Sequence, residues 1–124
     1  MLMLARNPAE AYARVDLDAR IEAAGGAELT RICLEEAVAS LGRAMLALER
    51  KPHAVPREAL IRAHSIALHL ARSVPSDNPL REALVQFYGG QAEAIGRNMR
   101  QANTPEISRI RDDFADLLEA ASAA

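Results

Sequence analysis

The chain has 124 residues, a length that suits one domain able to bury a core without disulfides or metal ions. Half of the residues are hydrophobic but only 3% are aromatic, and Ala, Leu, Arg and Glu are abundant, as is typical of helical proteins. The formal net charge is -2 and no basic cluster occurs, which argues against nucleic acid as a partner.

The N-terminal region is predicted to form a short helix over residues 7–15. Asn7 is a favourable N-cap, Pro8 suits the first turn, and Glu10 follows three residues after Asn7, as in a capping box. The preceding stretch MLMLAR is too short for a secretion signal or a membrane span. We therefore expect a cytoplasmic protein without membrane insertion, and the single cysteine fits a reducing compartment.

Four long helices are predicted after the Gly25-Gly26 break. The first runs from about Gly26 to Lys51, and the others follow Val55-Pro56, follow Asn78-Pro79 and begin at Thr104-Pro105-Glu106. The short connections favour antiparallel neighbours. The sequence therefore predicts a single all-α domain over residues 1–124. Its core is an antiparallel up-down four-helix bundle spanning about 26–120, and the 7–15 helix is an addition.

Hydrophobic residues at helical spacing mark the expected core. In the first long helix these are Leu29, Ile32, Cys33, Leu41, Met45 and Leu48, and in the last they are Ile107, Ile110, Phe114, Leu117 and Leu118. Cys33 lies among core positions, so we expect a small buried hydrophobe rather than a reactive thiol.

The helix after Val55-Pro56 is apolar over most of its circumference. Its polar residues form one narrow stripe, made of Arg62, Ser65, His69 and Arg72. A helix of this kind is buried on most sides. Two accounts remain open: the neighbouring helices cover it completely, or a groove beside it takes a segment of a partner protein.

The third long helix contains Gly89-Gly90 and Gly96. Each glycine inside a helix costs about 0.5–1 kcal/mol relative to alanine. Either a close approach of another helix or ligand, or a local kink, would account for them.

The usual chemistry of enzymes is absent from the sequence. His64 and His69 are five residues apart, so they do not share a helix face as a zinc pair would, and surface positions are expected. The acidic residues of the last helix alternate with Arg109 and Arg111, which predicts a solvated charged face. We therefore expect no catalytic residues, no metal and no cofactor.

The order of these segments resembles the flagellar secretion chaperone family, FliS. The residues that carry the resemblance are Asn7-Pro8 to Tyr12, the segment ALIRAHSIALHL from Ala59 to Leu70, the segment ALVQFYGGQAEAIGRNMRQAN with Tyr88 and Ala102-Asn103, and EISRIRDDFADLL. It covers about Asn7 to Leu118. The chain departs from the family at Gly25-Gly26-Ala27, where Ser/Thr-Pro is usual, in its Asp- and Arg-rich linker, and in the missing C-terminal aromatic residue.

The resemblance implies a chaperone that binds the disordered C-terminal segment of flagellin along grooves of the bundle and presents it to the flagellar export gate. Further flagellar regulators are implied as additional partners. By the same resemblance, the helix with Tyr12 lies over part of the binding surface as a flap that moves when flagellin arrives. A fixed lid is the alternative for Tyr12. The groove would comprise Tyr12, Val15, Leu60, Ile61, Ala63, Ile66, Ala67, Leu70, Val74, Tyr88, Ile95 and Met99.

Two other function classes compete with this expectation. A helical structural or regulatory adaptor would use the same apolar surface to self-associate or to bind a different protein. A bundle enzyme or sensor would use His64 and His69.

Overall fold

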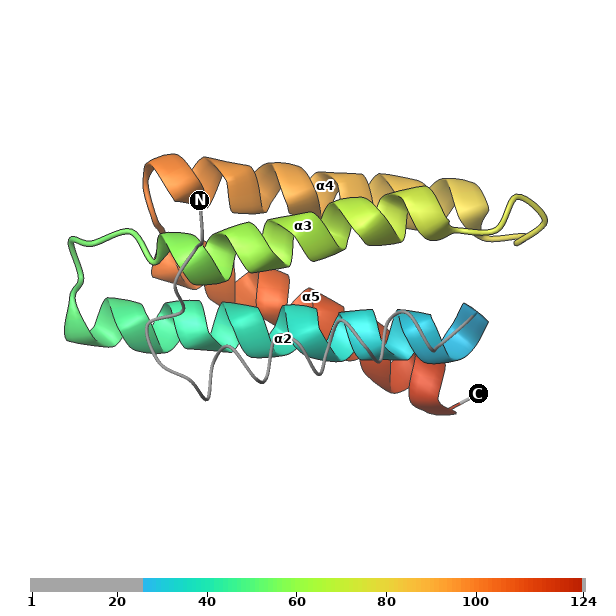
Figure 1. Cartoon of the computed structure of the whole chain (residues 1–124), viewed down its shortest axis with the longest axis horizontal. Coiled ribbons are helices and arrows are strands. Elements are labelled where there is room, and N and C mark those ends of the chain that lie inside the picture. The colour runs from blue at the N-terminus through green and yellow to red at the C-terminus, as the bar shows by residue number, and fades with distance from the viewer. Residues whose placement is uncertain (1–25, 124) are drawn as a thin grey trace, which may run out of the picture.

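The computed structural model describes residues 26–123, which fold into four α-helices (Figure 1). The helices are α2 (Gly26–Arg50), α3 (Arg57–Ser73), α4 (Arg81–Arg100) and α5 (Thr104–Ala123). Consecutive helices run antiparallel, α2 packs against both α3 and α5, and α3 packs against α4. This confirms the predicted all-α up-down bundle. The predicted helix at 7–15, with Tyr12 and Val15, lies outside the described residues.

The helices begin close to the predicted positions, and local chemistry accounts for this. Gly26 starts α2 with a φ of 58°, a left-handed conformation that glycine adopts without a steric penalty. Pro56 precedes α3, and its carbonyl accepts the Leu60 N–H at 3.1 Å. Asn103 caps α5, because its Oδ1 accepts the Glu106 N–H at 2.8 Å.

The start of α4 differs slightly from the prediction. The sequence predicts a helix that follows Asn78-Pro79, and so starts at Leu80, whereas α4 begins one residue later, at Arg81. The Asn78 Oδ1 accepts the Leu80 N–H at 2.8 Å, and its carbonyl accepts the Arg81 N–H at 3.0 Å. Asn78 therefore forms a turn just ahead of the helix, a role that asparagine side chains commonly take.

The core is built from one stripe of each helix. Most of the predicted core positions on α2 and α5 are buried, while Leu29, Met45, Leu117 and Leu118 are half-buried. Cys33 is 1% exposed, which confirms the expected buried position. The largest fully buried side chains include Phe114, Leu34, Leu41, Leu60, Ile95, Ile107 and Ile110.

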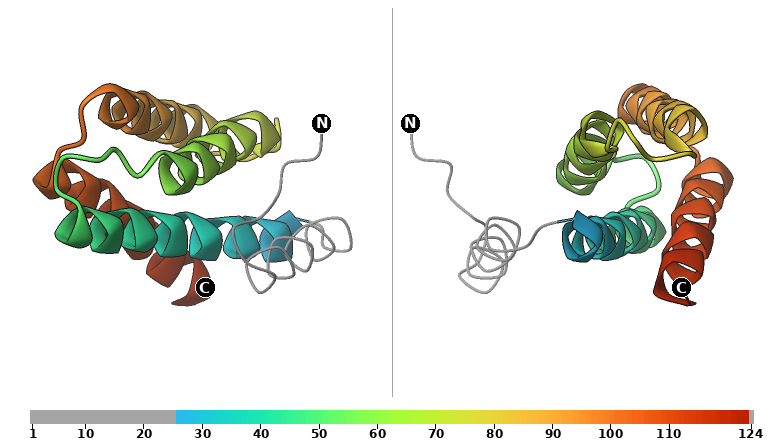
Figure 2. Two further views of the ribbon diagram at one scale, coloured as in Figure 1. Left: turned by 60° about the vertical axis from the view of Figure 1, so that its left-hand side comes forward. Right: turned by 90° about the vertical axis from the view of Figure 1, so that its right-hand side faces the viewer.

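The α4–α5 pair makes the fewest contacts of the neighbouring pairs. Figure 2 shows α5 crossing the other helices obliquely, so that it leaves the corner where it follows α4 and ends beyond α2. One aromatic contact joins the two helices: Phe87 of α4 lies in a T-shaped arrangement with Phe114 of α5, with ring centroids 5.7 Å apart, and in a second such arrangement with its neighbour Tyr88 at 5.6 Å. Edge-to-face pairs of this kind stabilise a core beyond their buried area.

Of the accounts left open for the glycines of α4, a close approach of another helix does not apply to Gly89 and Gly90. Within the described part of the chain, a Cβ built at either residue would meet no packing neighbour within 4 Å. At Gly96 the nearest atom, His64 Nε2, would lie 4.0 Å away, an ordinary contact. The helix continues through all three glycines from Arg81 to Arg100.

Candidate protein-binding surface

Seven of the twelve proposed groove residues lie in the bundle core. Each is at most 6% exposed, and the set comprises Leu60, Ala63, Ile66, Ala67 and Leu70 of α3 with Tyr88 and Ile95 of α4. Helix α3 packs against both α2 and α4, and these seven residues belong to the core cluster that the helices share. These seven side chains are closed to solvent in the structure, so a partner segment would reach them only after the residues that cover them move.

The other candidates occupy different environments. Ile61 is 49% exposed, whereas Val74 and Met99 are half-buried against the edge of the core. Tyr12 and Val15 lie outside the described residues. Among the candidates that the structure describes, Ile61 is therefore the one whose side chain a partner can reach without any change in the bundle.

The exposed face of α3 differs from the predicted polar stripe. Ser65 and Arg72 are exposed as expected, but Arg62 and His69 are half-buried. In their place Ile61 and Leu68, seven residues apart and so on one side of the helix, face solvent. We call the exposed row the outer strip; it consists of Ile61, Ser65, Leu68 and Arg72.

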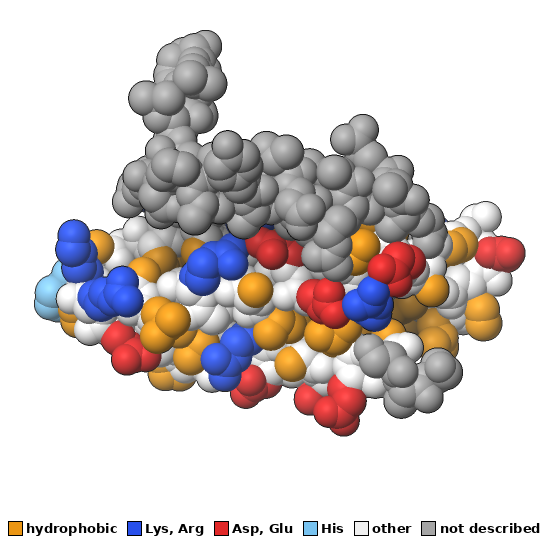
Figure 3. All heavy atoms as spheres, turned by 60° about the horizontal axis from the view of Figure 1, so that its bottom comes forward, with side chains coloured by type: hydrophobic (Ala, Val, Ile, Leu, Met, Phe, Trp, Pro, Cys, Tyr) orange, Lys and Arg blue, Asp and Glu red, His pale blue; other side chains and the backbone are white. Residues whose placement is uncertain are grey.

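Over the described range, the remaining exposed large hydrophobic residues are Leu46 on α2 and Leu80 before α4. On the face that carries α2 and α5, hydrophobic side chains are interspersed with charged ones (Figure 3). Exposed residues of this kind are common singly on protein surfaces. The outer strip of α3 stands out because it brings two of them onto one face.

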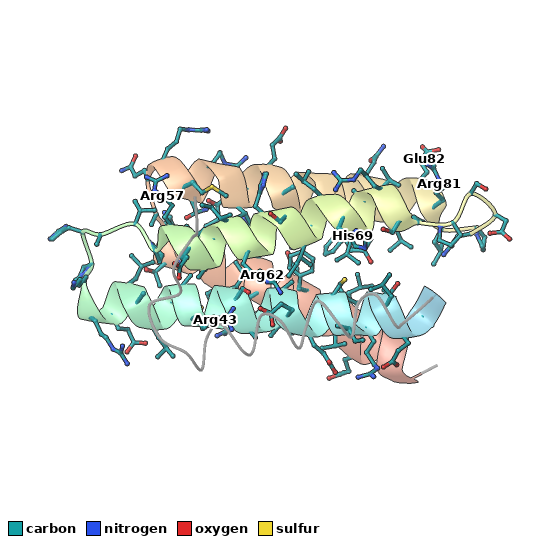
Figure 4. All side chains as sticks on the ribbon, in the orientation of Figure 1. Arg43, Arg57, Arg62, His69, Arg81 and Glu82 are labelled. Carbon is teal, nitrogen blue, oxygen red and sulfur yellow. The ribbon has the colours of Figure 1, made fainter. Side chains whose placement is uncertain are left out.

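A cluster of charged and polar side chains joins α2 to α3 (Figure 4). The Glu36 carboxylate lies 3.0 Å from Arg43 Nη2 and 3.5 Å from Arg62 Nε, and it accepts a hydrogen bond from the Ser40 hydroxyl at 3.2 Å. Arg43 also donates to the Ser40 hydroxyl at 2.8 Å. The ion pair with Glu36 connects Arg62 of α3 to α2.

A second polar cluster lies at the corner between α4 and α5. Asn98 is fully buried; its amide nitrogen donates to the Ala94 carbonyl at 2.9 Å and to Glu106 Oε1 at 2.8 Å, and its oxygen accepts the Asn103 N–H at 2.7 Å. Arg97 and Arg109 donate to Glu106 Oε2 at 2.9 and 3.3 Å. An open hollow of about 430 Å³ beside this cluster is lined by Arg97, Arg100, Gln101, Ala102, Asn103 and Glu106.

This second cluster should make stability depend on pH. Hydrogen bonds from Arg97 and then Asn98 hold the pKa of Glu106 below its ordinary value of 4.5. A carboxyl with a lowered pKa in the folded state stabilises the protein above its unfolded pKa, and this contribution is lost as the pH falls through the folded pKa. Glu106→Gln should therefore be less stable than the natural protein at pH 7, and the difference should shrink below about pH 4.5.

Urea unfolding at pH 7 and at pH 3.5 measures this difference. The matched control is Glu93→Gln, the same change at an exposed position on α4; we expect its offset from the natural protein to be the same at both pH values. An equal offset for Glu106→Gln at the two pH values would contradict the role given to its hydrogen bonds.

The histidines and the cysteine show no shared site. His69 Nε2 lies 3.2 Å from the Ser73 hydroxyl, and His64 is half-buried beside α4. Burial raises the pKa of the Cys33 thiol and of the Tyr88 hydroxyl, which keeps both groups neutral. Among residues 26–123, no group of three or more His, Cys, Asp or Glu side chains is placed to hold a metal ion.

Comparison with models of known protein families and with curated proteins finds no match to this chain. None of the helices over the described range is both long and apolar enough to cross a membrane. In the described residues the four helices share a buried core, and the outer strip of α3 carries Ile61 and Leu68 in alternation with Ser65 and Arg72.

Proposed function

We propose that this protein is a cytoplasmic export chaperone of the FliS type. It binds the disordered C-terminal segment of flagellin, prevents premature polymerisation and delivers flagellin to the flagellar type III export gate. The observation that carries the proposal is the order and spacing of sequence segments from about Asn7 to Leu118. The four antiparallel helices, which begin close to the positions that this pattern implies, support it.

The surface of α3 supports the proposal physically. A disordered segment that folds on binding must offset about 2–5 kcal/mol of ordering, and burial of apolar surface on both partners supplies that energy. Ile61 and Leu68 on the outer strip offer such surface where a partner helix can lie along α3. Binding of this kind requires no catalytic residue and no cofactor.

Isothermal titration with a flagellin peptide tests the proposal. The peptide covers about the last forty residues of flagellin from the same organism, and circular dichroism follows helix content during the titration. We expect tight one-to-one binding, a negative heat-capacity change and added helix. Absence of heat with a folded protein and a soluble peptide would remove the proposal.

A pair of variants locates the binding surface. Ile61→Asp places a charge on the outer strip, and Leu46→Asp makes the same change at a similarly exposed position on α2. A buried isoleucine contributes about 1.5–3 kcal/mol, so Ile61→Asp should weaken peptide binding by about tenfold or more. Leu46→Asp should leave the affinity unchanged, and equal effects of the two variants would exclude the outer strip as the site.

The outer strip also favours a second candidate function, a helical adaptor that self-associates through α3. In that case the mass measured by sedimentation would rise with protein concentration, Ile61→Asp would abolish the rise, and the flagellin peptide would not bind.

A further inference from the structure

We infer that Gly89 and Gly90 form a hinge in α4. About this hinge the first half of the helix, Arg81–Tyr88, opens away from the bundle while the second half, Gln91–Arg100, stays in place. The inference concerns the free protein and stands apart from the proposed function. It rests on differences in burial and in polar contacts between the two halves.

The two halves of α4 are buried to different extents. In the first half only Tyr88, its last residue, is buried, whereas Leu84, Val85 and Phe87 are half-buried and the others are exposed. In the second half five residues are buried: Gln91, Ala92, Ala94, Ile95 and Asn98. Segments with few buried contacts open at lower free energy than segments in the core. We therefore expect the first half of α4 to open locally at a lower free energy than the second half.

Polar contacts anchor the second half alone. Gln91 Nε2 donates to the Ile110 carbonyl at 3.3 Å, Asn98 donates to Glu106 at 2.8 Å, and Arg97 pairs with Glu106 at 2.9 Å. All the side-chain hydrogen bonds described between α4 and α5 thus come from Gln91 or later. The first half meets α5 through the Phe87–Phe114 ring contact, which can separate without leaving a buried polar group unpaired.

The boundary between the halves coincides with the two glycines. Gly89 and Gly90 are exposed, and no packing neighbour among the described residues lies near enough to require the absence of a side chain. Glycine loses more backbone freedom in a helix than any other residue, so a glycine pair is the weakest point of the helical backbone. A bend at this pair leaves the hydrogen bonds of Gln91 and Asn98 intact.

Opening of the first half would uncover part of the core. Because α3 and α4 are antiparallel, the first half of α4 lies beside the second half of α3, which contains the buried Ala67 and Leu70 (Figure 1). These side chains are covered in the closed bundle. The hinge thereby gives a route by which apolar residues of the interior become reachable without unfolding of the whole domain.

Native-state hydrogen exchange on the full chain tests the hinge. After correction for intrinsic rates, the amides of Val85–Tyr88 should exchange at one common rate, at least tenfold faster than those of Ile95–Met99, with a step at the glycines. The double variant Gly89→Ala/Gly90→Ala should slow exchange at Val85–Tyr88 at least fivefold, because alanine disfavours the bent backbone.

The matched control is Gly42→Ala, which fills a similarly open position in the middle of α2. It should slow amides that exchange by global unfolding and leave Val85–Tyr88 unchanged. Three results would overturn the inference: equal rates in the two halves, a smooth gradient along α4 that the double variant does not change, or slowing of Val85–Tyr88 by Gly42→Ala as large as by the double variant.

Discussion

Phe114→Ala should lower the free energy of unfolding by about 3–5 kcal/mol, the cost of removing a buried phenylalanine and leaving a cavity. Among the described residues Phe114 is the largest fully buried side chain, and its ring packs against Phe87 across the seam between α4 and α5. Since small domains are stable by only about 5–15 kcal/mol, this loss would be a large share of the total.

Urea unfolding followed by circular dichroism at 222 nm measures the change. Leu46→Ala is the control, because Leu46 is 55% exposed and its truncation should change stability by less than about 0.5 kcal/mol. Phe114→Leu keeps most of the volume and should fall between the two. A loss below about 1 kcal/mol for Phe114→Ala would mean that α5 moves in to fill the space, and that the seam is softer than its ring contacts indicate.

The helices of this fold could be predicted from sequence because their signals are local. Each signal acts within a few residues of the chain: proline near the helix start, the glycine break at Gly25-Gly26, and the spacing of Ile107, Ile110 and Phe114. Asn78 shows the limit of such signals. Its side chain can cap a helix or close a turn, and the structure has the turn, so α4 starts at Arg81.

The candidate groove could not be placed in the same way. The apolar circumference of α3 is compatible with a groove or with burial on both sides, and only the arrangement of α2 and α4 around it decides between them. Leu60 and Ile61 are adjacent in sequence and equally hydrophobic, yet one is fully buried and the other is 49% exposed. Their difference depends on the direction in which α3 faces its neighbours, which hydropathy does not encode.

The second polar cluster, at the corner between α4 and α5, could not be predicted from the sequence. Asn98 stands in the sequence as one polar residue near the end of a helix, and nothing there pairs it with Glu106 eight residues later. In the fold it is fully buried and contacts Ala94, Asn103 and Glu106 at once. A buried amide with all of its partners present rigidifies the turn that it spans. This turn sets the direction in which α5 leaves α4, and so the geometry of the seam.

Asn98→Ala should therefore lower the free energy of unfolding by about 2–4 kcal/mol. Each hydrogen bond contributes about 0.5–1.5 kcal/mol net, and the Asn103 N–H left without its acceptor adds a desolvation cost of about 1–3 kcal/mol. Packing contributes little to the expected loss, because asparagine is small and the removed atoms are polar. Urea unfolding at pH 7 gives the value, and exposed Gln101→Ala on the same corner serves as the reference for a change that removes no buried contact.

Asn98→Asp separates hydrogen bonding from size. The aspartate has nearly the same shape and can still accept the Asn103 N–H, but at pH 7 it cannot donate to Ala94 or Glu106 and its charge faces the Glu106 carboxylate. We expect it to be at least as destabilising as Asn98→Ala, since it places a buried negative charge beside the Glu106 carboxylate. If Asn98→Asp were as stable as the natural protein, the two donor contacts would carry no energy. The corner would then be held by the Asn103 cap and the Arg97–Glu106 ion pair alone.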